Sequence, residues 1–326
     1  MRAILFRLLK GVFVPAICIA AFGTAGAQDR YPHRPIQLII GIPAGGPTDV
    51  QTRALALAVS KELGQPVVVV NKPGVAGTLG PSQMAASSAP DGYTLSVLLS
   101  TLMTLPHTNP QSMRFDPRTD FTWIAKITNY SFAVMVRADS PYKSMQQLLD
   151  HARANPGKVA YGHSGVGGAT HSSVEKLSKA AGVRFNDIPY AGGTPIYQAL
   201  MGGFIEFAAT AGFGPFLQDS RFRLLAVMTE TRLPTRPDIP TLKELKLEGT
   251  PDVWWGIGGP KRMDPSIVAT LTAAFQKAAR DPGFLRTLEM DDQTVNWANG
   301  PELNAMITRL YAQEELNARE LGLKKQ

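Results

Sequence analysis

Four glycine-rich turns are the part of this sequence best suited to chemistry with a small ligand. Each follows an apolar run typical of a strand and precedes a segment with helical spacing. The turns lie at 43–49, 73–80, 164–171 and 191–195. A helix start exposes unpaired N–H groups at the positive end of the helix dipole, and glycine lets an anion approach them closely. Because ligands of open α/β sheets bind beyond the carboxyl ends of strands, the four turns predict an anion-binding cleft.

The composition of the turns favours recognition by the backbone. Three turns contain no lysine or arginine, and Lys72 only borders the turn at 73–80. We therefore expect backbone N–H groups to hold a carboxylate, assisted by hydroxyl groups. The hydroxyl groups in question belong to Thr48, Ser164, Thr170 and Thr194. Asp49 leaves two possibilities open, because it could reach the ligand through water or cap its own helix.

Two enzyme motifs are incomplete in the third turn. The stretch 162–166 resembles a nucleophile elbow, but Val166 stands where the second glycine is required. The following residues resemble a dinucleotide-binding fingerprint, with Asp187 twenty residues beyond Gly167, but Thr170 occupies the third glycine position. A secreted serine hydrolase and a dehydrogenase-like enzyme are therefore kept only as alternatives.

The histidines and the cysteine give no sign of a metal site. None of the five histidines forms an H-x-x-x-H pair or stands beside clustered carboxylates in the sequence, so no metal and no cofactor is predicted. His171 is left with two interpretations, a ligand contact or a helix-packing residue. The aromatic residues Trp254, Trp255, Phe213 and Phe216 are more typical of a core than of a stacking platform. The single cysteine, Cys18, excludes an intrachain disulfide framework.

The first 27 residues have the features of a cleavable export signal. Three basic residues precede an apolar run of 13 residues at 11–23, and the A-x-A sequence at 25–27 predicts cleavage after Ala27. The mature chain then has 299 residues, and its net charge falls from +7 to +4. At about 1.5 Å per residue, the apolar run is too short to cross a bilayer core of about 30 Å. We therefore expect a periplasmic protein.

The remaining composition indicates an ordered protein that does not bind nucleic acid. Hydrophobic residues make up 44 % of the sequence, which excludes general disorder. Lysine and arginine are scattered, and no run of five like charges occurs. We expect a monomer without a nucleic-acid partner.

Short apolar runs alternate with helical patterns along the whole mature chain. Strands are predicted at 36–40, 67–70, 93–99, 132–136, 158–161 and 223–228, and helices at 49–63, 144–155, 170–181, 194–202, 264–280 and 300–321. Ser144 and Gln147 form a predicted capping box, and Thr194 is a predicted N-cap. This alternation predicts parallel α/β sheets in two doubly wound lobes.

Two crossovers are expected because no Gly/Ser linker separates the lobes. We place them near Asn129 and Gly249. Domain 1 would contain residues 28–129 and 250–326, and domain 2 would contain residues 130–249.

The order of short motifs resembles the tripartite tricarboxylate transporter substrate-binding proteins, also called Bug receptors. The motifs lie at 31–36, 44–49, 63–69, 71–74, 90–95, 120–121, 155–158, 188–193, 225–227, 232–234, 238–241 and 255–256. Each motif alone is weak, but their order along the mature chain is specific.

This resemblance implies a receptor with a periplasmic-binding-protein-like α/β fold, in which two domains are joined by a hinge around a ligand cleft. Such a protein is not an enzyme. It closes on a small organic carboxylate and delivers it to the membrane components of the transporter. The positions that match the family's binding residues are Ala44, Gly45, Asp49, Ser100, Thr101, Ser164, Gly165, Gly168, Thr170, His171, Tyr190, Gly192 and Thr194.

Three departures from the family pattern bear on the ligand. The family usually has serine where His163 stands, often has serine at Gly168, and commonly has aspartate at Thr210. Without that carboxylate, a ligand amino group lacks a natural partner, and Phe213 adds apolar surface nearby. We therefore expect Thr210 and Phe213 to complete a site for a carboxylate without an amine. A ligand-binding adaptor for a signalling protein stays open as another function.

Overall fold

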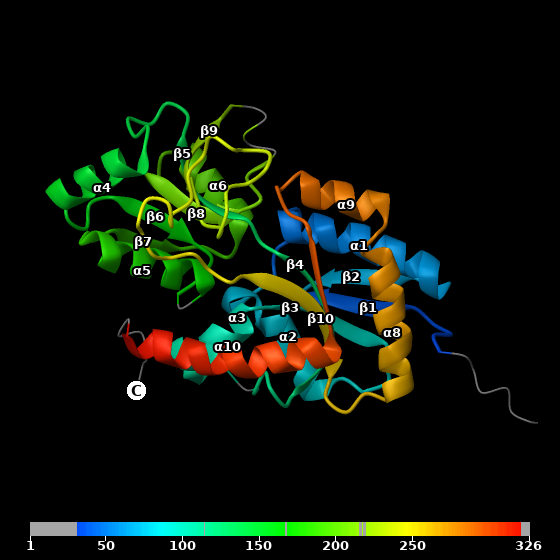
Figure 1. Cartoon of the computed structure of the whole chain (residues 1–326). Coiled ribbons are helices and arrows are strands. Elements are labelled where there is room, and N and C mark those ends of the chain that lie inside the picture. The colour runs from blue at the N-terminus through cyan, green and yellow to red at the C-terminus, as the bar shows by residue number, and fades with distance from the viewer. Residues whose placement is uncertain (1–30, 114, 167, 215–216, 218–219, 321–326) are drawn as a thin grey trace, which may run out of the picture. The chain divides into compact units, whose positions relative to one another are not determined.

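Two sheets organise the chain (Figure 1). The computed structural model describes residues 31–113, 115–166, 168–214, 217 and 220–320, so the predicted export signal at 1–27 lies outside the described residues. One sheet has the strand order β11-β4-β10-β3-β1-β2 and the other β7-β6-β8-β5-β9. The strands are β1 (Ile36–Ile40), β2 (Val67–Asn71), β3 (Thr94–Leu99), β4 (Phe121–Asn129), β5 (Phe132–Arg137), β6 (Ala160–His163), β7 (Asn186–Pro189), β8 (Phe207–Ala211), β9 (Phe222–Val227), β10 (Trp254–Pro260) and β11 (Val295–Asn299).

Both sheets are mixed, so the prediction of parallel sheets is wrong in this respect. In the six-stranded sheet, β1 pairs in parallel with β2 and β3, whereas β10 is antiparallel to β3 and β4, and β11 to β4. In the five-stranded sheet, β6 is parallel to β7 and β8, whereas β5 is antiparallel to β8 and β9. The physical reason is the route of the chain, because β5 and β10 are the strands by which the chain enters each sheet from the other.

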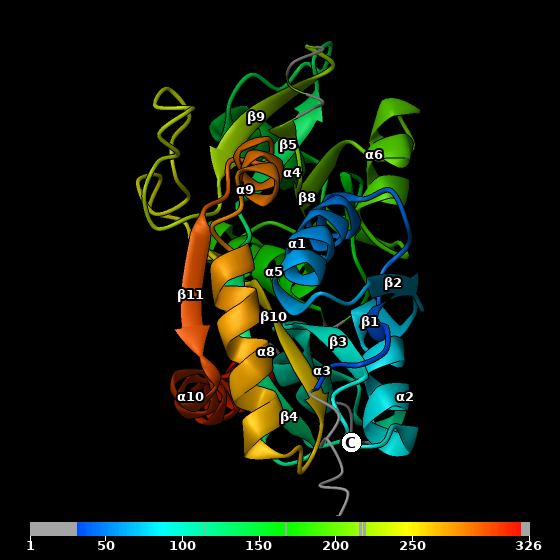
Figure 2. The ribbon, with the colours of Figure 1, turned by 90° about the vertical axis from the view of Figure 1, so that its right-hand side faces the viewer.

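Helices cover both faces of the six-stranded sheet (Figures 1 and 2). One face packs against α1 (Pro47–Leu63), α8 (Pro265–Ala278) and α9 (Pro282–Glu289). The other packs against α2 (Leu79–Ser87), α3 (Thr101–Thr108) and α10 (Gly300–Glu320). Trp254 and Trp255 are consecutive residues of β10, so their side chains pack on opposite faces of the sheet. Both side chains are fully buried, which confirms that they are core residues.

The five-stranded sheet is covered in the same way. Helices α4 (Met145–Ala154) and α5 (Ala169–Ala181) pack on one face, and α6 (Gly193–Met201) packs on the other. The short 3-10 helices η1 (Val75–Gly77) and η2 (Pro110–Ser112) lie in connections of the first half of the chain. Among the described helices, none combines the length and the apolar character needed to cross a membrane.

The chain passes between the two sheets at two places. It leaves β4 at Asn129 and enters β5 at Phe132, and it returns between the end of β9 at Val227 and the start of β10 at Trp254. The two-domain α/β architecture is therefore confirmed, while the domain boundaries 28–129, 130–249 and 250–326 stay predictions.

Most local signals were predicted correctly, but the predicted N-cap of α6 is wrong, and the strand predicted at 158–161 lies at Ala160–His163. Gly64 ends α1 in the left-handed conformation, and the Ser144 hydroxyl caps α4 by accepting a hydrogen bond from the Gln147 N–H. Thr194 is not an N-cap, because Gly192 takes that position and α6 begins at Gly193. The φ angle of 134° at Gly192 explains the shift, since side chains rarely tolerate this backbone conformation.

The N-cap of α4, a helix that packs on the five-stranded sheet, provides a test of the contribution of capping to stability. Replacing Ser144 with alanine should lower the free energy of unfolding by about 1 kcal/mol, because the Gln147 N–H loses its acceptor. Ser144→Gly is the matched control, with an expected loss of about a few tenths of a kcal/mol. Urea unfolding measures both, and equal stability of the two variants would contradict the capping role.

Candidate functional site

A pocket of about 400 Å³ lies where loops of both sheets meet. Loops that follow β1, β2 and β3 form one side, and loops that follow β6 and β7 form the other. The crossover residues Tyr130, Phe132 and Val253 contribute to its lining. The chain therefore places the predicted glycine-rich turns around one cavity.

Among the described residues that line this pocket, none carries a charged side chain. Its polar side chains are those of Thr48, Thr101, Asn109, Tyr130, Ser164, Thr170, Tyr190, Thr194 and Thr210. Its large apolar side chains are those of Ile42, Val75, Leu99, Leu105, Phe132, Val166 and Val253. A ligand in this pocket would meet hydroxyl groups, backbone and apolar surface.

At the pocket, α3 begins without a side-chain cap, and so do three helices whose N-caps are glycines. Their N-caps are Gly46 in α1, Gly168 in α5 and Gly192 in α6, and each lacks a side-chain hydrogen bond to the first turn. Residues of these first turns, or the cap itself, line the pocket. In contrast, α4, α8 and α9 begin with side-chain caps, which are Ser144, Asp264 and Asp281. The N–H groups of the first turns of α1, α5 and α6 are therefore left to solvent or to a ligand.

Asp49 braces the first glycine-rich turn instead of facing the pocket. Its carboxylate accepts hydrogen bonds from Gly45 N at 3.0 Å, Arg53 Nε at 3.0 Å and Asn71 Nδ2 at 2.8 Å. Burial alone would raise the pKa of Asp49, but these hydrogen bonds and the Arg53 charge hold it below its ordinary value. The side chain is only 4 % exposed, so Asp49 is a structural anion of the loop.

The loops of the two sheets approach each other most closely at glycines. A Cβ atom on Gly46 would lie 3.4 Å from Thr194 Oγ1, and one on Gly192 would lie 3.3 Å from Pro43 Cδ. A Cβ on Gly165 would lie 3.0 Å from the Cβ of Ala76. At Gly46 such a Cβ would make an ordinary contact, whereas at Gly165 and Gly192, which have φ angles of 117° and 134°, a side chain would be both tight and strained.

Hydroxyl groups of residues that line the pocket also contact one another. Thr48 Oγ1 lies 2.6 Å from Tyr130 Oη, which ties the start of α1 to the first crossover. Ser164 Oγ lies 3.3 Å from Thr170 Oγ1 across the third glycine-rich turn. These contacts fix the direction of hydroxyl groups that line the pocket.

Eight predicted site residues line the pocket and seven do not. Those in the lining are Thr101, Ser164, Gly165, Thr170, Tyr190, Gly192, Thr194 and Thr210. Those outside it are Ala44, Gly45, Asp49, Ser100, Gly168, His171 and Phe213. Phe213 is fully buried among core residues that pack on α6, and the Ser100 hydroxyl accepts a hydrogen bond from Trp254 N at 3.4 Å. The ligand contacts of all fifteen residues stay predictions.

Several lining residues were missed from the sequence. Tyr130, Phe132 and Val253 lie at the crossovers, and Leu105 and Asn109 lie in and just after α3. The predicted crossover near Asn129 was a usable signal for the first two, because the cleft of such a fold lies beside the segments that join its lobes.

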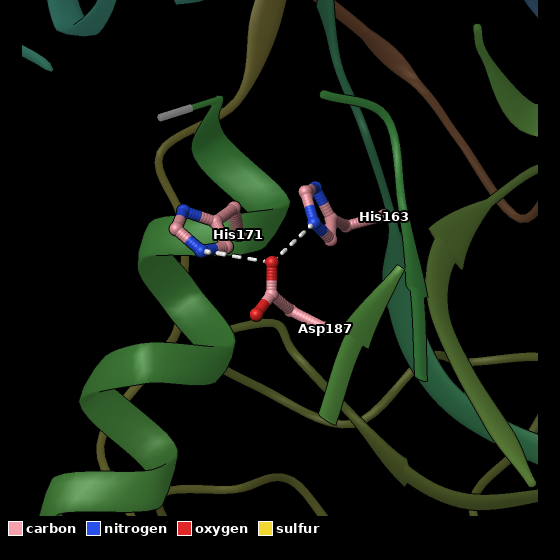
Figure 3. Close-up of side chains that lie close together, drawn as sticks. All are labelled: His163, His171 and Asp187. Atoms are coloured by element: carbon pink, nitrogen blue, oxygen red, sulfur yellow. Dashed lines mark ion pairs between the residues drawn. The ribbon is translucent and has the colours of Figure 1, made fainter. Parts of the chain in front are cut away.

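A cluster of two histidines and an aspartate was not recognised from the sequence, from which no metal site was predicted. His163 Nε2 lies 3.5 Å and His171 Nε2 3.9 Å from Asp187 Oδ2 (Figure 3). Burial lowers the pKa of both histidines, and the charge of His171 lowers that of His163 further. His171 lies eight positions after His163, and Asp187 lies sixteen positions after His171, so only the pairing of β6 with β7 brings the three together.

A buried carboxyl group lies behind the first crossover. Asp291 is 4 % exposed, and its Oδ2 accepts a hydrogen bond from Gln51 Nε2 at 2.8 Å. Burial, with a smaller contribution from the charge of Asp292, raises the pKa of Asp291 to about 7. The hydrogen bond from Gln51 opposes this shift but does not cancel it.

Comparison with known proteins agrees with this architecture. The family profile described as "Tripartite tricarboxylate transporter family receptor" matches residues 51–323. A Cupriavidus necator protein described as "UPF0065 protein in gbd 5'region" is 39 % identical over 311 residues, which cover 95 % of this chain and 94 % of that protein.

Two solved structures share the whole fold. The structure of the periplasmic binding protein BugD is 30 % identical with a TM-score of 0.84, and the match covers 91 % of this chain and 100 % of BugD. The structure of R. palustris Rpa4515 with adipate is 26 % identical with a TM-score of 0.84, and the match covers 90 % of this chain and 98 % of that one.

The two-domain α/β fold and the pocket between its loops define a solute-binding protein of the periplasmic binding type. The chain belongs to the tripartite tricarboxylate transporter receptor family. This confirms the resemblance seen in the order of the sequence motifs. Because the family and the structural neighbours are binding proteins, it also confirms that the chain is a receptor and not an enzyme.

The contribution of Asp291 to the stability should fall as the pH rises from about 4 to about 7, because native Asp291 keeps a proton that the unfolded chain releases, whereas His163 and His171, with their lowered pKa values, contribute with the opposite sign. The contribution of this group is at most about 1.4 kcal/mol per pH unit. Asp291→Asn should remove it and be more stable than the parent at pH 8, since Asn keeps an acceptor for Gln51. Thermal unfolding across pH tests this, with the exposed Asp238→Asn as control. An unchanged pH profile in Asp291→Asn would refute the assignment.

Proposed function

We propose that this protein is a periplasmic receptor that closes on a small carboxylate-bearing solute and delivers it to the membrane components of a transporter. One observation carries the proposal: three helices with glycine N-caps and no side-chain cap begin at a pocket whose described lining residues carry no charged side chain. Each helix start is equivalent to about half a positive charge. A carboxylate is the ligand group that such N–H donors suit, and it needs no arginine or lysine partner.

The rest of the pocket favours a ligand without an amino group. A ligand ammonium group needs a carboxylate partner when it is buried, and the lining offers none. Leu99, Leu105, Phe132 and Val253 supply apolar surface for a hydrocarbon or aromatic part. Rpa4515, which shares the fold, was solved with adipate, an aliphatic dicarboxylate, and this supports the same class of ligand here.

Closure of the two domains would place the ligand between donors from both sheets. The start of α1 comes from one domain, and the starts of α5 and α6 come from the other. A solute that bridges them binds the closed state more tightly than the open state, and it therefore shifts the population toward closure. The closed form is then the state that a membrane partner would recognise.

Location and partners follow from the same assignment. The export signal at 1–27, with cleavage after Ala27, would send the receptor to the periplasm, where the related BugD is described as a binding protein. The receptor would act as a monomer and without a cofactor. An adaptor that presents the ligand to a signalling protein would use the same pocket, and only the identity of the membrane partner separates the two functions.

Calorimetry of the mature chain tests the class of ligand. We expect saturable binding of adipate or another dicarboxylate, or of an aromatic monocarboxylate, and no binding of lysine or inorganic phosphate. Glutamate and aspartate should bind weakly, because their ammonium group would be buried without a partner. Tight binding of glutamate or aspartate, together with no binding of any amine-free carboxylate, would overturn the proposal.

A charge placed at the start of α6 tests the mode of binding. Thr194 is the second residue of α6, and a Cβ on Gly46 would lie 3.4 Å from its hydroxyl, so Thr194→Asp would carry a carboxylate between two helix starts. An acidic residue in the first turn stabilises a helix, so the fold should be retained. We expect affinity to fall on the order of 100-fold through repulsion of the ligand anion.

Thr194→Ser is the matched control, because it keeps the hydroxyl group without a charge. Its affinity should stay close to that of the parent protein. Unchanged affinity in Thr194→Asp, with melting temperature equal to or above that of the parent, would show that the ligand anion does not lie at this helix start.

A further inference from the structure

Three side chains that could bind a cation meet beside the third glycine-rich turn, outside the lining of the pocket (Figure 3). His163 ends β6, His171 lies in the first turn of α5, and Asp187 lies in the edge strand β7. Their ligand atoms all lie within 4.8 Å of one another. His163 is fully buried and His171 nearly so, whereas the Asp187 side chain is 46 % exposed.

The contacts of His163 define which nitrogen of its ring carries hydrogen. Nδ1 lies 2.9 Å from the carbonyl oxygen of Gly165, which can only accept a hydrogen bond. Nδ1 is therefore protonated, and Nε2 of the neutral ring presents a lone pair. This buried Nε2 has no hydrogen-bond partner among the described residues.

When both histidine rings are neutral, no side chain of the cluster supplies a positive charge. His163 Nε2 faces Asp187 Oδ2 at 3.5 Å, and two acceptors at this separation repel unless a proton or a metal ion lies between them. His163 is fully buried, and burial disfavours the doubly protonated ring. Glu175, one turn beyond His171 on α5, adds negative charge that acts on His171. The surroundings therefore favour a positive ion that the side chains themselves do not supply.

The donor set and its spacing fit a transition metal. Two imidazoles and one carboxylate form a donor set of the kind that binds Zn²⁺. With metal–ligand distances of about 2.0–2.1 Å, tetrahedral coordination separates ligand atoms by about 3.3 Å. The observed 3.5 Å and 3.9 Å come close to this value. The hydrogen bond from Nδ1 to Gly165 O is the outer contact that commonly orients a metal-bound histidine.

We propose that His163, His171 and Asp187 bind a divalent transition-metal ion, with Zn²⁺ as the best match and water completing the coordination on the exposed side of Asp187. The ion would join the end of β6, the start of α5 and the edge strand β7. It would therefore clamp both ends of the turn that contains Ser164 and Thr170, which line the pocket. This proposal does not depend on the nature of the solute.

Calorimetric titration of the mature, tag-free and chelator-treated chain with Zn²⁺ tests the site, with Co²⁺ absorption as a second probe. We expect one saturable site per chain and a higher melting temperature with Zn²⁺ but not with Mg²⁺. Asp187→Asn and His171→Gln should each weaken Zn²⁺ binding on the order of 100-fold, because each removes one of three ligands. Asp187 is half exposed, so its variant should fold normally.

His151→Gln is the control variant, because this exposed histidine lies on α4 and outside the cluster. It should bind Zn²⁺ as the parent does. Absence of saturable Zn²⁺ and Co²⁺ binding would overturn the proposal, as would full affinity in both Asp187→Asn and His171→Gln. Titration of adipate in the same preparations separates the two proposals, since loss of only one kind of binding contradicts only the corresponding site.

Discussion

The structure around the pocket depends on the unsatisfied N–H groups at the starts of three helices. A helix start that has no side-chain cap must find an acceptor elsewhere, and α1, α5 and α6 all begin with glycine at the pocket. Helices α4, α8 and α9, which begin elsewhere, satisfy the same need with Ser144, Asp264 and Asp281. The proposed function gives the glycines at the pocket a role in ligand binding in addition to their role in turn geometry.

The surrounding side chains keep these helix starts in place while leaving the pocket neutral. Asp49 supplies a negative charge to the first turn, and Arg53 and Asn71 engage this charge through hydrogen bonds. Thr48 and Tyr130 link α1 to the crossover through their hydroxyl groups. Loops held by such contacts lower the cost of ordering the donors when a solute arrives.

The third glycine-rich turn serves two environments at once. Its outer residues Ser164 and Thr170 face the pocket, whereas His163 and His171, which flank them, turn toward Asp187 on the other side. A cation bound by the two histidines would therefore hold both ends of the turn that contributes Ser164 and Thr170 to the pocket. The same stretch of chain thus borders both the pocket proposed to bind an anion and the cluster proposed to bind a cation.

Local sequence chemistry alone determined many of the secondary-structure elements and turns of this protein. The strands at 36–40 and 67–71, the cap of α4 at Ser144 and the glycine-rich turns depend on residues within a few positions of each other, so their patterns were readable from the sequence. The order of motifs likewise identified the family.

Only the tertiary structure decided the rest, because those features join residues that are distant in the sequence. The antiparallel course of β5 and β10 follows from the route between the sheets. Asp49 meets Asn71 across 22 positions, and Thr48 meets Tyr130 across 82. The cluster of His163, His171 and Asp187 exists only because β7 pairs with β6 while α5 packs beside them. Neither spacing nor composition encodes such contacts, since they depend on how the sheets assemble.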